Sequence, residues 1–362
     1  MLYYLLYPLH ETISFFNIFR YITFRGAMAA LTAFILSLIF GPPMIKALRR
    51  FKIGENVRKE DSAKLYELHS SKQDTPTMGG LLILSAVILS TLLWAEVFNK
   101  YIILSLFSTV WLGVTGFIDD YIKQVRKKSK GLTVTAKLTS QIVLGLIIGL
   151  ILFLSPPYNT KISIPFFKDV FLDAGVFYVL FVILVIAGSS NAVNLTDGLD
   201  GLAIGSVIMV ALTFSVLSYV TGNVKFSDYL LIPYVKGAGE LAIFCASILG
   251  AGLGFLWFNC YPASIFMGDV GSLALGGALG IVALLIKKEL LLVIVGGIFV
   301  VEALSVILQV GSFRLRKKRI FKIAPLHHHF QFLGLAESKV IVRFWIVASL
   351  LALLTLVTLK IR

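Results

Sequence analysis

The sequence predicts an all-α polytopic integral membrane protein, and three observations lead to that fold class. Hydrophobic residues make up 58% of the 362 residues and charged residues only 14%, whereas a soluble domain is about half apolar and about a quarter charged. The mean hydropathy is +0.91, and apolar runs of about 20 residues recur along the chain. Most basic residues lie between these runs. We therefore expect a single membrane-embedded domain over residues 1–362.

Ten segments are apolar enough and about long enough to cross a bilayer core. Residues 1–20 precede them and lack the basic start and the cleavage site of a signal peptide, so we expect an interfacial segment there. Residues 155–173 alternate polar and apolar side chains, which is typical of a short β-hairpin. The predicted spans are 24–45, 78–97, 101–118, 137–154, 174–190, 201–220, 239–257, 269–286, 290–310 and 341–359.

The Lys and Arg residues are distributed unevenly among the loops. Of the 33 in the chain, 22 lie in 46–77, 119–137 and 311–343. Positively charged loops stay in the cytoplasm, so we predict that both chain ends lie outside. The net charge of +14 then reflects orientation and anionic ligands, and we expect no nucleic-acid partner. The predicted cytoplasmic loops that carry the active site are 46–77, 119–137, 188–200, 258–268 and 311–340.

The most informative stretch is NAVNLTDGLDG, residues 191–201, which lies between two apolar runs. Acidic side chains at the centre of a spanning helix cost about 2.5–3.5 kcal/mol each, so a chain that keeps them is expected to use them. If the stretch is helical, Asn194, Asp197 and Asp200 follow one another at i, i+3 and share one face. The alternative is a polar loop capped by Asn and Asp.

Two further motifs carry carboxylates beside apolar residues. Asp119 and Asp120 end the third predicted span, and Lys123 follows Asp119 by one helical turn. Adjacent carboxylates repel unless a cation or proton intervenes, which favours a divalent metal over the alternative of a solvated helix end. Asp269 lies beside Gly268 in the first turn of the eighth span. That position also suits an acidic residue that interacts with the helix dipole.

The last basic loop contains three successive histidines, residues 327–329. They cannot all point one way, so a zinc site made from these alone has poor geometry, whereas a pair at i and i+2 on an extended segment could contact phosphate. The basic run 314–319 could instead hold anionic lipid heads. Glu302 and Gln309 lie seven residues apart on the ninth span, and for Glu302 we expect a buried helix–helix hydrogen bond.

The side chains suited to chemistry gather near one predicted membrane surface. Hard oxygen ligands favour Mg²⁺ over zinc, and magnesium with lysines is the usual means of handling a diphosphate. We therefore predict phosphoryl transfer between a cytoplasmic nucleotide compound and a membrane lipid. The alternatives from other classes are a cation-coupled transporter, although carriers usually bind near mid-membrane, and a scramblase-like lipid-binding protein.

Five motifs resemble those of the phospho-N-acetylmuramoyl-pentapeptide-transferases, bacterial translocase I. The similarity covers nearly the whole chain, and two central motifs are shared with the wider polyprenyl-phosphate N-acetylhexosamine-1-phosphate transferase superfamily. A sister transferase that uses UDP-N-acetylglucosamine is therefore a rival. The motifs are TPTMGG (75–80), GFIDDYIK (116–123), NAVNLTDGLDGL (191–202), FNCYPASIFMGDVGS (258–272) and APLHHHF (324–330).

The resemblance implies a reaction of UDP-N-acetylmuramoyl-pentapeptide with undecaprenyl phosphate that gives lipid I and UMP and requires Mg²⁺. It also implies a homodimer in the bacterial inner membrane. A phosphate monoester has its second pKa at about 6, so the lipid phosphate is largely dianionic at neutral pH and needs little help from a base. We favour direct attack on the sugar-linked phosphorus, and a covalent aspartyl-phosphate route stays open.

The resemblance also implies roles for individual residues. The aspartate matching Asp269 binds the metal, and the one matching Asp119 deprotonates the lipid phosphate or helps to hold metal and phosphate, with Asp120 beside it. A catalytic role is expected for His328 as well. The expected uridine pocket comprises Lys72, Gly198, Leu199, Asp200, Asn259 and Phe266. The expected diphosphate and sugar side comprises Asn194, Asp197, Gln309, His327 and His328, with phosphate contacts from Lys123 and Lys137 and further substrate contacts from Thr77 and His329.

Overall fold

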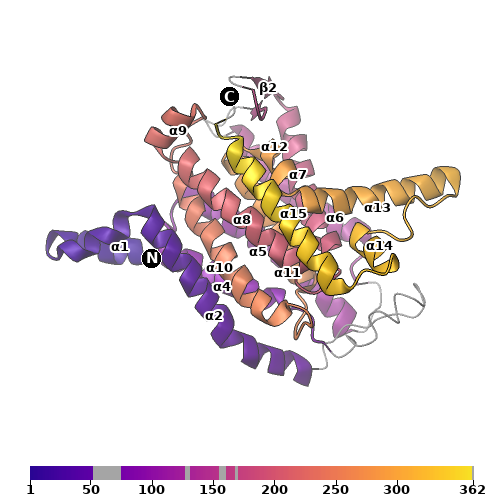
Figure 1. Cartoon of the computed structure of the whole chain (residues 1–362). Helices are drawn as coiled ribbons and strands as arrows, with labels where there is room; N and C mark the ends of the chain where they lie inside the picture. Colours follow the sequence, from indigo (N-terminus) through magenta and orange to yellow (C-terminus); the bar gives the residue numbers. More distant parts are fainter. Residues whose placement is uncertain (52–74, 127–130, 155–159, 168–169, 361–362) are drawn as a thin grey trace.

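The computed structural model describes residues 1–51, 75–126, 131–154, 160–167 and 170–360, and Figure 1 shows them as a bundle of helices. Within these residues, nine helices are long and apolar enough to cross a membrane. A tenth apolar helix, α4 (Gly80–Trp94), is shorter. The predicted all-α polytopic fold is therefore confirmed. The nine are α2 (Ile22–Arg50), α5 (Lys100–Gln124), α6 (Val134–Leu154), α7 (Phe177–Thr196), α8 (Leu202–Thr221), α10 (Leu241–Asn259), α11 (Gly268–Leu285), α13 (Gly297–Arg316) and α15 (Glu337–Val357).

Short elements connect these helices. The predicted hairpin is present, because β1 (Lys161–Ser163) pairs antiparallel with β2 (Phe171–Asp173). Residues 1–20, the predicted interfacial segment, form helical turns before α2 and project from the bundle (Figure 1). The remaining short helices are α1 (Leu2–Leu6), η1 (Tyr7–Glu11), η2 (Ser14–Arg20), α9 (Val224–Leu230), η4 (Ala238–Glu240), α12 (Glu289–Val295) and α14 (Leu326–Phe332).

The predicted span 290–310 is not one straight helix. It divides at Gly296 into α12 and α13, and Figure 1 shows the far end of α13 projecting away from the bundle. A Gly-Gly pair at 296–297 permits the break because glycine has little preference for continuing a helix. The apolar run continues through the break, so hydrophobicity alone could not reveal it.

Helix α11 lies at the centre of the bundle. All of residues 270–285 are buried, and the helix packs against α5 and α7. Small residues let helices approach closely in a membrane, where the hydrophobic effect does not drive them together. One close approach of backbone to backbone is at Gly116 of α5, where a Cβ would lie 2.2 Å from the carbonyl oxygen of Asp269. The first turn of α11 is therefore held directly against the end of α5.

Replacing Gly116 by Ala should damage this contact. The added methyl group would meet the backbone of α11, which cannot move aside as a flexible side chain could. Overpacking of this kind typically costs about 1–3 kcal/mol, so we expect a lower Tm and reduced turnover in the purified protein. The matched control is Gly311→Ala in α13, because nothing lies within 4 Å of a Cβ there. Equal Tm and turnover in the two variants would contradict the close approach of α5 and α11.

Candidate active site

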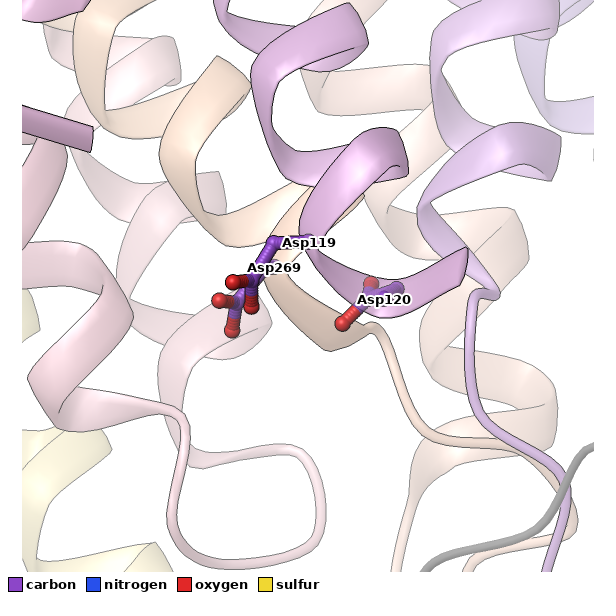
Figure 2. A group of neighbouring side chains, drawn as sticks. All are labelled: Asp119, Asp120 and Asp269. Atoms are coloured by element: carbon purple, nitrogen blue, oxygen red, sulfur yellow. The ribbon is translucent and has the colours of Figure 1, made fainter. Parts of the chain in front are cut away.

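Three carboxylates from two helices meet at one end of the bundle. Asp119 and Asp120 lie at the end of α5, and Asp269 lies in the first turn of α11 (Figure 2). One oxygen from each can be chosen so that all three lie within 4.8 Å of one another. Asp119 and Asp120 are buried, whereas the Asp269 side chain keeps 15% of its surface exposed. The predicted convergence of acidic motifs is therefore present for Asp119, Asp120 and Asp269.

Backbone contacts between motifs fix this meeting point. The TPTMGG segment pairs with the chain just before α11, because Gly79 N donates to Phe266 O at 2.8 Å and Phe266 N donates to Pro76 O at 2.8 Å. Asp120 Oδ2 accepts a hydrogen bond from Val270 N at 3.1 Å. Thus α4, α5 and α11 are tied together within a few residues of Asp269.

Two lysine ammonium groups lie between the carboxylates. Lys137 Nζ, from α6, lies 2.5 Å from Asp269 Oδ2 and 2.9 Å from Asp119 Oδ2. Lys123 Nζ lies 3.1 Å from Asp269 Oδ2 and also forms an ion pair with Asp119. The remaining oxygen of Asp119, Oδ1, accepts a hydrogen bond from Leu132 N at 2.7 Å. Both lysines expected to contact phosphate therefore lie at the acidic site.

Asn194 joins the same site from the last turn of α7. Its Nδ2 donates to Asp269 Oδ1 at 2.9 Å and to Ser272 Oγ at 2.8 Å. Asp269 is thus bound by side chains from three other helices. Ser272 was missed in the sequence, although its position one helical turn after Asp269 was a usable signal.

The predicted shared face of Asn194, Asp197 and Asp200 is wrong. Helix α7 ends at Thr196, with Asp197 as its C-cap, and Gly201 adopts φ +77° before α8 begins. Glycine takes this left-handed conformation readily, so the chain turns here instead of continuing as a helix. The alternative interpretation, a polar loop, is correct for 197–201.

The hydrogen bonds of Asp200 and Asn259 join two loops. Asp200 Oδ2 accepts from Ala263 N at 2.9 Å. Asn259 Oδ1 accepts from Gly201 N at 3.0 Å, and its Nδ2 donates to Ile265 O at 2.8 Å. Both side chains therefore bind the loops 197–201 and 260–265 to each other. Of the other residues predicted for the uridine pocket, Leu199 is buried, Gly198 lies against His327, Phe266 takes part in the pairing with Pro76, and Lys72 lies outside the described residues.

Helix α15 also contacts the loop 197–201, which the sequence did not indicate. Glu337 Oε1 accepts from Asp200 N at 3.2 Å, and Trp345 Nε1 donates to Gly201 O at 3.2 Å. These partners are more than 130 residues away along the chain, and no motif marks either of them. Thr77, expected to contact substrate, is buried close to Gly268.

The three histidines form a helix, α14, so the predicted extended pair is wrong. The rings of His328 and His329 bond to different partners. His328 Nδ1 lies 2.9 Å from Gln331 Oε1, and His329 Nδ1 accepts from Lys322 N at 3.1 Å. His327 is buried. Its ring lies beside that of His328, with 4.2 Å between the ring centroids.

Glu302 and Gln309 of α13 hold this helix and the loop before it. Glu302 accepts from Leu326 N at 2.8 Å and from His327 N at 3.1 Å, which confirms the predicted helix–helix hydrogen bond. Gln309 Oε1 accepts from the backbone of Ile320 and Phe321, each at 3.0 Å. The amide group of Gln309 is therefore bonded to protein backbone.

Comparison with known proteins identifies the family that this chain resembles. The model described as glycosyl transferase family 4 matches residues 102–287, and a phospho-N-acetylmuramoyl-pentapeptide-transferase signature matches 72–84. The chain is 54% identical over 362 residues to the phospho-N-acetylmuramoyl-pentapeptide-transferase of Citrifermentans bemidjiense, covering 100% of both chains. Proteins of the same name from Pelobacter propionicus and Desulfotalea psychrophila are 53% and 54% identical, again over 100% of both chains.

Proposed function

Since the chain belongs to the phospho-N-acetylmuramoyl-pentapeptide-transferases, we propose that its three clustered aspartates and two lysines are the centre at which that family's reaction takes place. The enzyme transfers phospho-N-acetylmuramoyl-pentapeptide from its UDP-linked form to undecaprenyl phosphate, giving lipid I and UMP. This is the first membrane step of peptidoglycan synthesis. The observation that carries the assignment of the centre is the meeting of Asp119, Asp120 and Asp269 with Lys123 and Lys137.

We propose that the carboxylates hold Mg²⁺. The donor set fits, because three carboxylates supply hard oxygen ligands within 4.8 Å of one another. In addition, Asp119 Oδ2 is buried and its described partners are the ammonium groups of Lys123 and Lys137, so this oxygen already faces cations. A bound Mg²⁺ would offset the charge of the diphosphate and of the attacking phosphate.

The lysines serve to bring two anions together. Lys123 and Lys137 each contact both Asp119 and Asp269, so their ammonium groups lie where substrate phosphates would approach. We propose that they turn from the carboxylates to phosphate oxygens when substrate binds. Fixed positive groups aimed at developing charge are usually the largest single contribution to such a reaction. Asn194 would keep Asp269 oriented during the exchange.

Asp119 has partners at both carboxylate oxygens, which favours a holding role over proton transfer. The lipid phosphate is already largely dianionic at neutral pH, since its second pKa is about 6. We therefore propose direct attack by the lipid phosphate on the sugar-linked phosphorus, with displacement of UMP. The distribution of Lys and Arg supports a site on the cytoplasmic face of the bacterial inner membrane. The homodimer implied by the family resemblance belongs to the same proposal.

An assay of UMP release separates the transferase from its rivals. Purified protein with Mg²⁺ and undecaprenyl phosphate should release UMP from UDP-N-acetylmuramoyl-pentapeptide and form a lipid-linked product. EDTA should stop the reaction, and excess Mg²⁺ should restore it. Release of UMP from UDP-N-acetylglucosamine alone would instead indicate the sister transferase. Ion movement in sealed vesicles without any lipid product would indicate a transporter.

A further inference from the structure

Glu302 and His327 form a fully buried pair beside the loop that separates α7 from α8. His327 Nδ1 lies 3.2 Å from Glu302 Oε2, and both side chains have 0% of their surface exposed. The same carboxylate accepts the backbone N–H of His327 at 3.1 Å and that of Leu326 at 2.8 Å. One side chain thus holds both the backbone and the ring of His327.

The other ring nitrogen of His327 faces the loop. A Cβ on Gly198 would lie 2.3 Å from His327 Nε2, so the ring packs directly against the glycine. Nε2 is buried, and like Nδ1 it makes no hydrogen bond of regular geometry in the part of the chain that the structure describes. Nδ1, however, has the 3.2 Å contact with Glu302 Oε2. A buried polar atom without a partner typically costs about 1–3 kcal/mol. Such an atom calls for a specific explanation, and a ligand that supplies the partner is one.

The carboxylate determines what Nε2 can do. A neutral imidazole carries its proton on one nitrogen, and the hydrogen bond made by that nitrogen decides which one it is. Glu302 beside Nδ1 favours the Nδ1–H form, in which Nδ1 donates to the carboxylate. Nε2 is then an acceptor, and it is aimed at the Gly198 loop.

We propose that Glu302 is a positioning residue that fixes the tautomer and orientation of His327, so that Nε2 accepts a hydrogen bond from a hydroxyl or N–H group of the sugar-nucleotide substrate. The inference rests on the proposed function, because it takes the Gly198 loop to border the substrate site. Glu302 of α13 thereby acts on the site through α14. Only glycine fits at 198, because any Cβ would displace the ring.

Imidazole ¹⁵N spectra of protein labelled in histidine test the proposal without any turnover. The chain has five histidines, so His327→Asn assigns the signals of His327. We expect an Nδ1–H, unprotonated Nε2 pattern for His327 in the wild type, and a shift of its Nε2 signal when UDP-N-acetylmuramoyl-pentapeptide is added. A protonated Nε2 in the wild type, or a signal that substrate leaves unmoved, would overturn the proposal.

Glu302→Gln keeps the size of the side chain and one oxygen, which can accept from His327 N, but it removes the oxygen that accepts from Leu326 N. Its amide N–H₂ would face Nδ1 and reverse the tautomer. We expect kcat/KM to fall by about 10- to 100-fold, by analogy with the loss of a partner that orients a metal-bound histidine. Glu302→Asp retains the charge and should keep more activity than the Gln variant. The control is Ser305→Ala, a buried position one turn away that donates only to Glu302 O. Its His327 spectrum and turnover should match the wild type.

Failure of the positioning role and failure of the proposed function give different experimental results. If wild-type protein makes no lipid I, the proposed function fails, and the spectra still decide the tautomer. If Glu302→Gln folds poorly, the wild-type spectra and the Asp variant carry the test. A Gln variant with a wild-type His327 spectrum and wild-type kcat/KM would refute the positioning role.

Discussion

Asp269→Asn is expected to reduce the rate of lipid I formation by at least about 10³-fold, the upper part of the range for loss of one preorganised electrostatic contact. The reason is that Asp269 Oδ2 contacts both Lys123 and Lys137, while Oδ1 accepts from Asn194. Asparagine keeps the volume but removes the charge that holds these groups and the proposed metal. The loss should therefore appear mainly in kcat.

The measurement compares single-turnover rates at saturating substrate with those of Asp228→Asn. Asp228 lies exposed in α9, outside the acidic site, and provides the same chemical change. Both variants should keep a wild-type Tm. Turnover by a folded Asp269→Asn protein within tenfold of the wild type would remove Asp269 from the catalytic centre.

Asp119→Asn is expected to reduce turnover by about 10²- to 10³-fold. The asparagine oxygen could still accept from Leu132 N, as Oδ1 does now at 2.7 Å. Its amide N–H₂ would then face the two lysine ammonium groups that Asp119 Oδ2 contacts in the wild type. The two lysines would lose the carboxylate that they share and would no longer be held in place. They would therefore bind the substrate phosphates more weakly.

The pH dependence of this variant separates two roles for Asp119. If it holds the lysines and metal, the fractional loss should be constant from about pH 7 to pH 9, because the lipid phosphate, with a second pKa of about 6, is already a dianion there. If it removes a proton, the loss should be largest near pH 6 and shrink as the pH rises. A loss that disappears at high pH would contradict the holding role.

The sequence predicts the spans well because each is a run of apolar side chains of about bilayer length. The break between α12 and α13 is different. It depends on how glycines at 296–297 pack, and the apolar composition is the same on both sides. The turn after Thr196 could have been expected from two glycines in the NLTDGLDG stretch, but the carboxylate spacing favoured a helix instead.

The sequence could predict that the acidic motifs lie at one membrane surface. It could not predict which side chains form ion pairs or hydrogen bonds there. Lys123 and Asp269 are 146 residues apart, and their contact depends on the close approach of α5 to α11 at Gly116. Asp200 gives a second example. Its Oδ2 accepts a hydrogen bond from Ala263 N, which is 63 residues away along the chain. Tertiary contacts of this kind leave no spacing pattern in the sequence.

The most direct test of the acidic centre is metal binding measured without turnover. Purified protein titrated with Mn²⁺, which substitutes for Mg²⁺ in oxygen-ligand sites, should show saturable binding by electron paramagnetic resonance. Competition with Mg²⁺ should release it. Binding should persist in Asp228→Asn and be lost in Asp269→Asn. Wild-type Mn²⁺ binding by a folded Asp269→Asn protein would contradict the assignment of a metal to Asp119, Asp120 and Asp269.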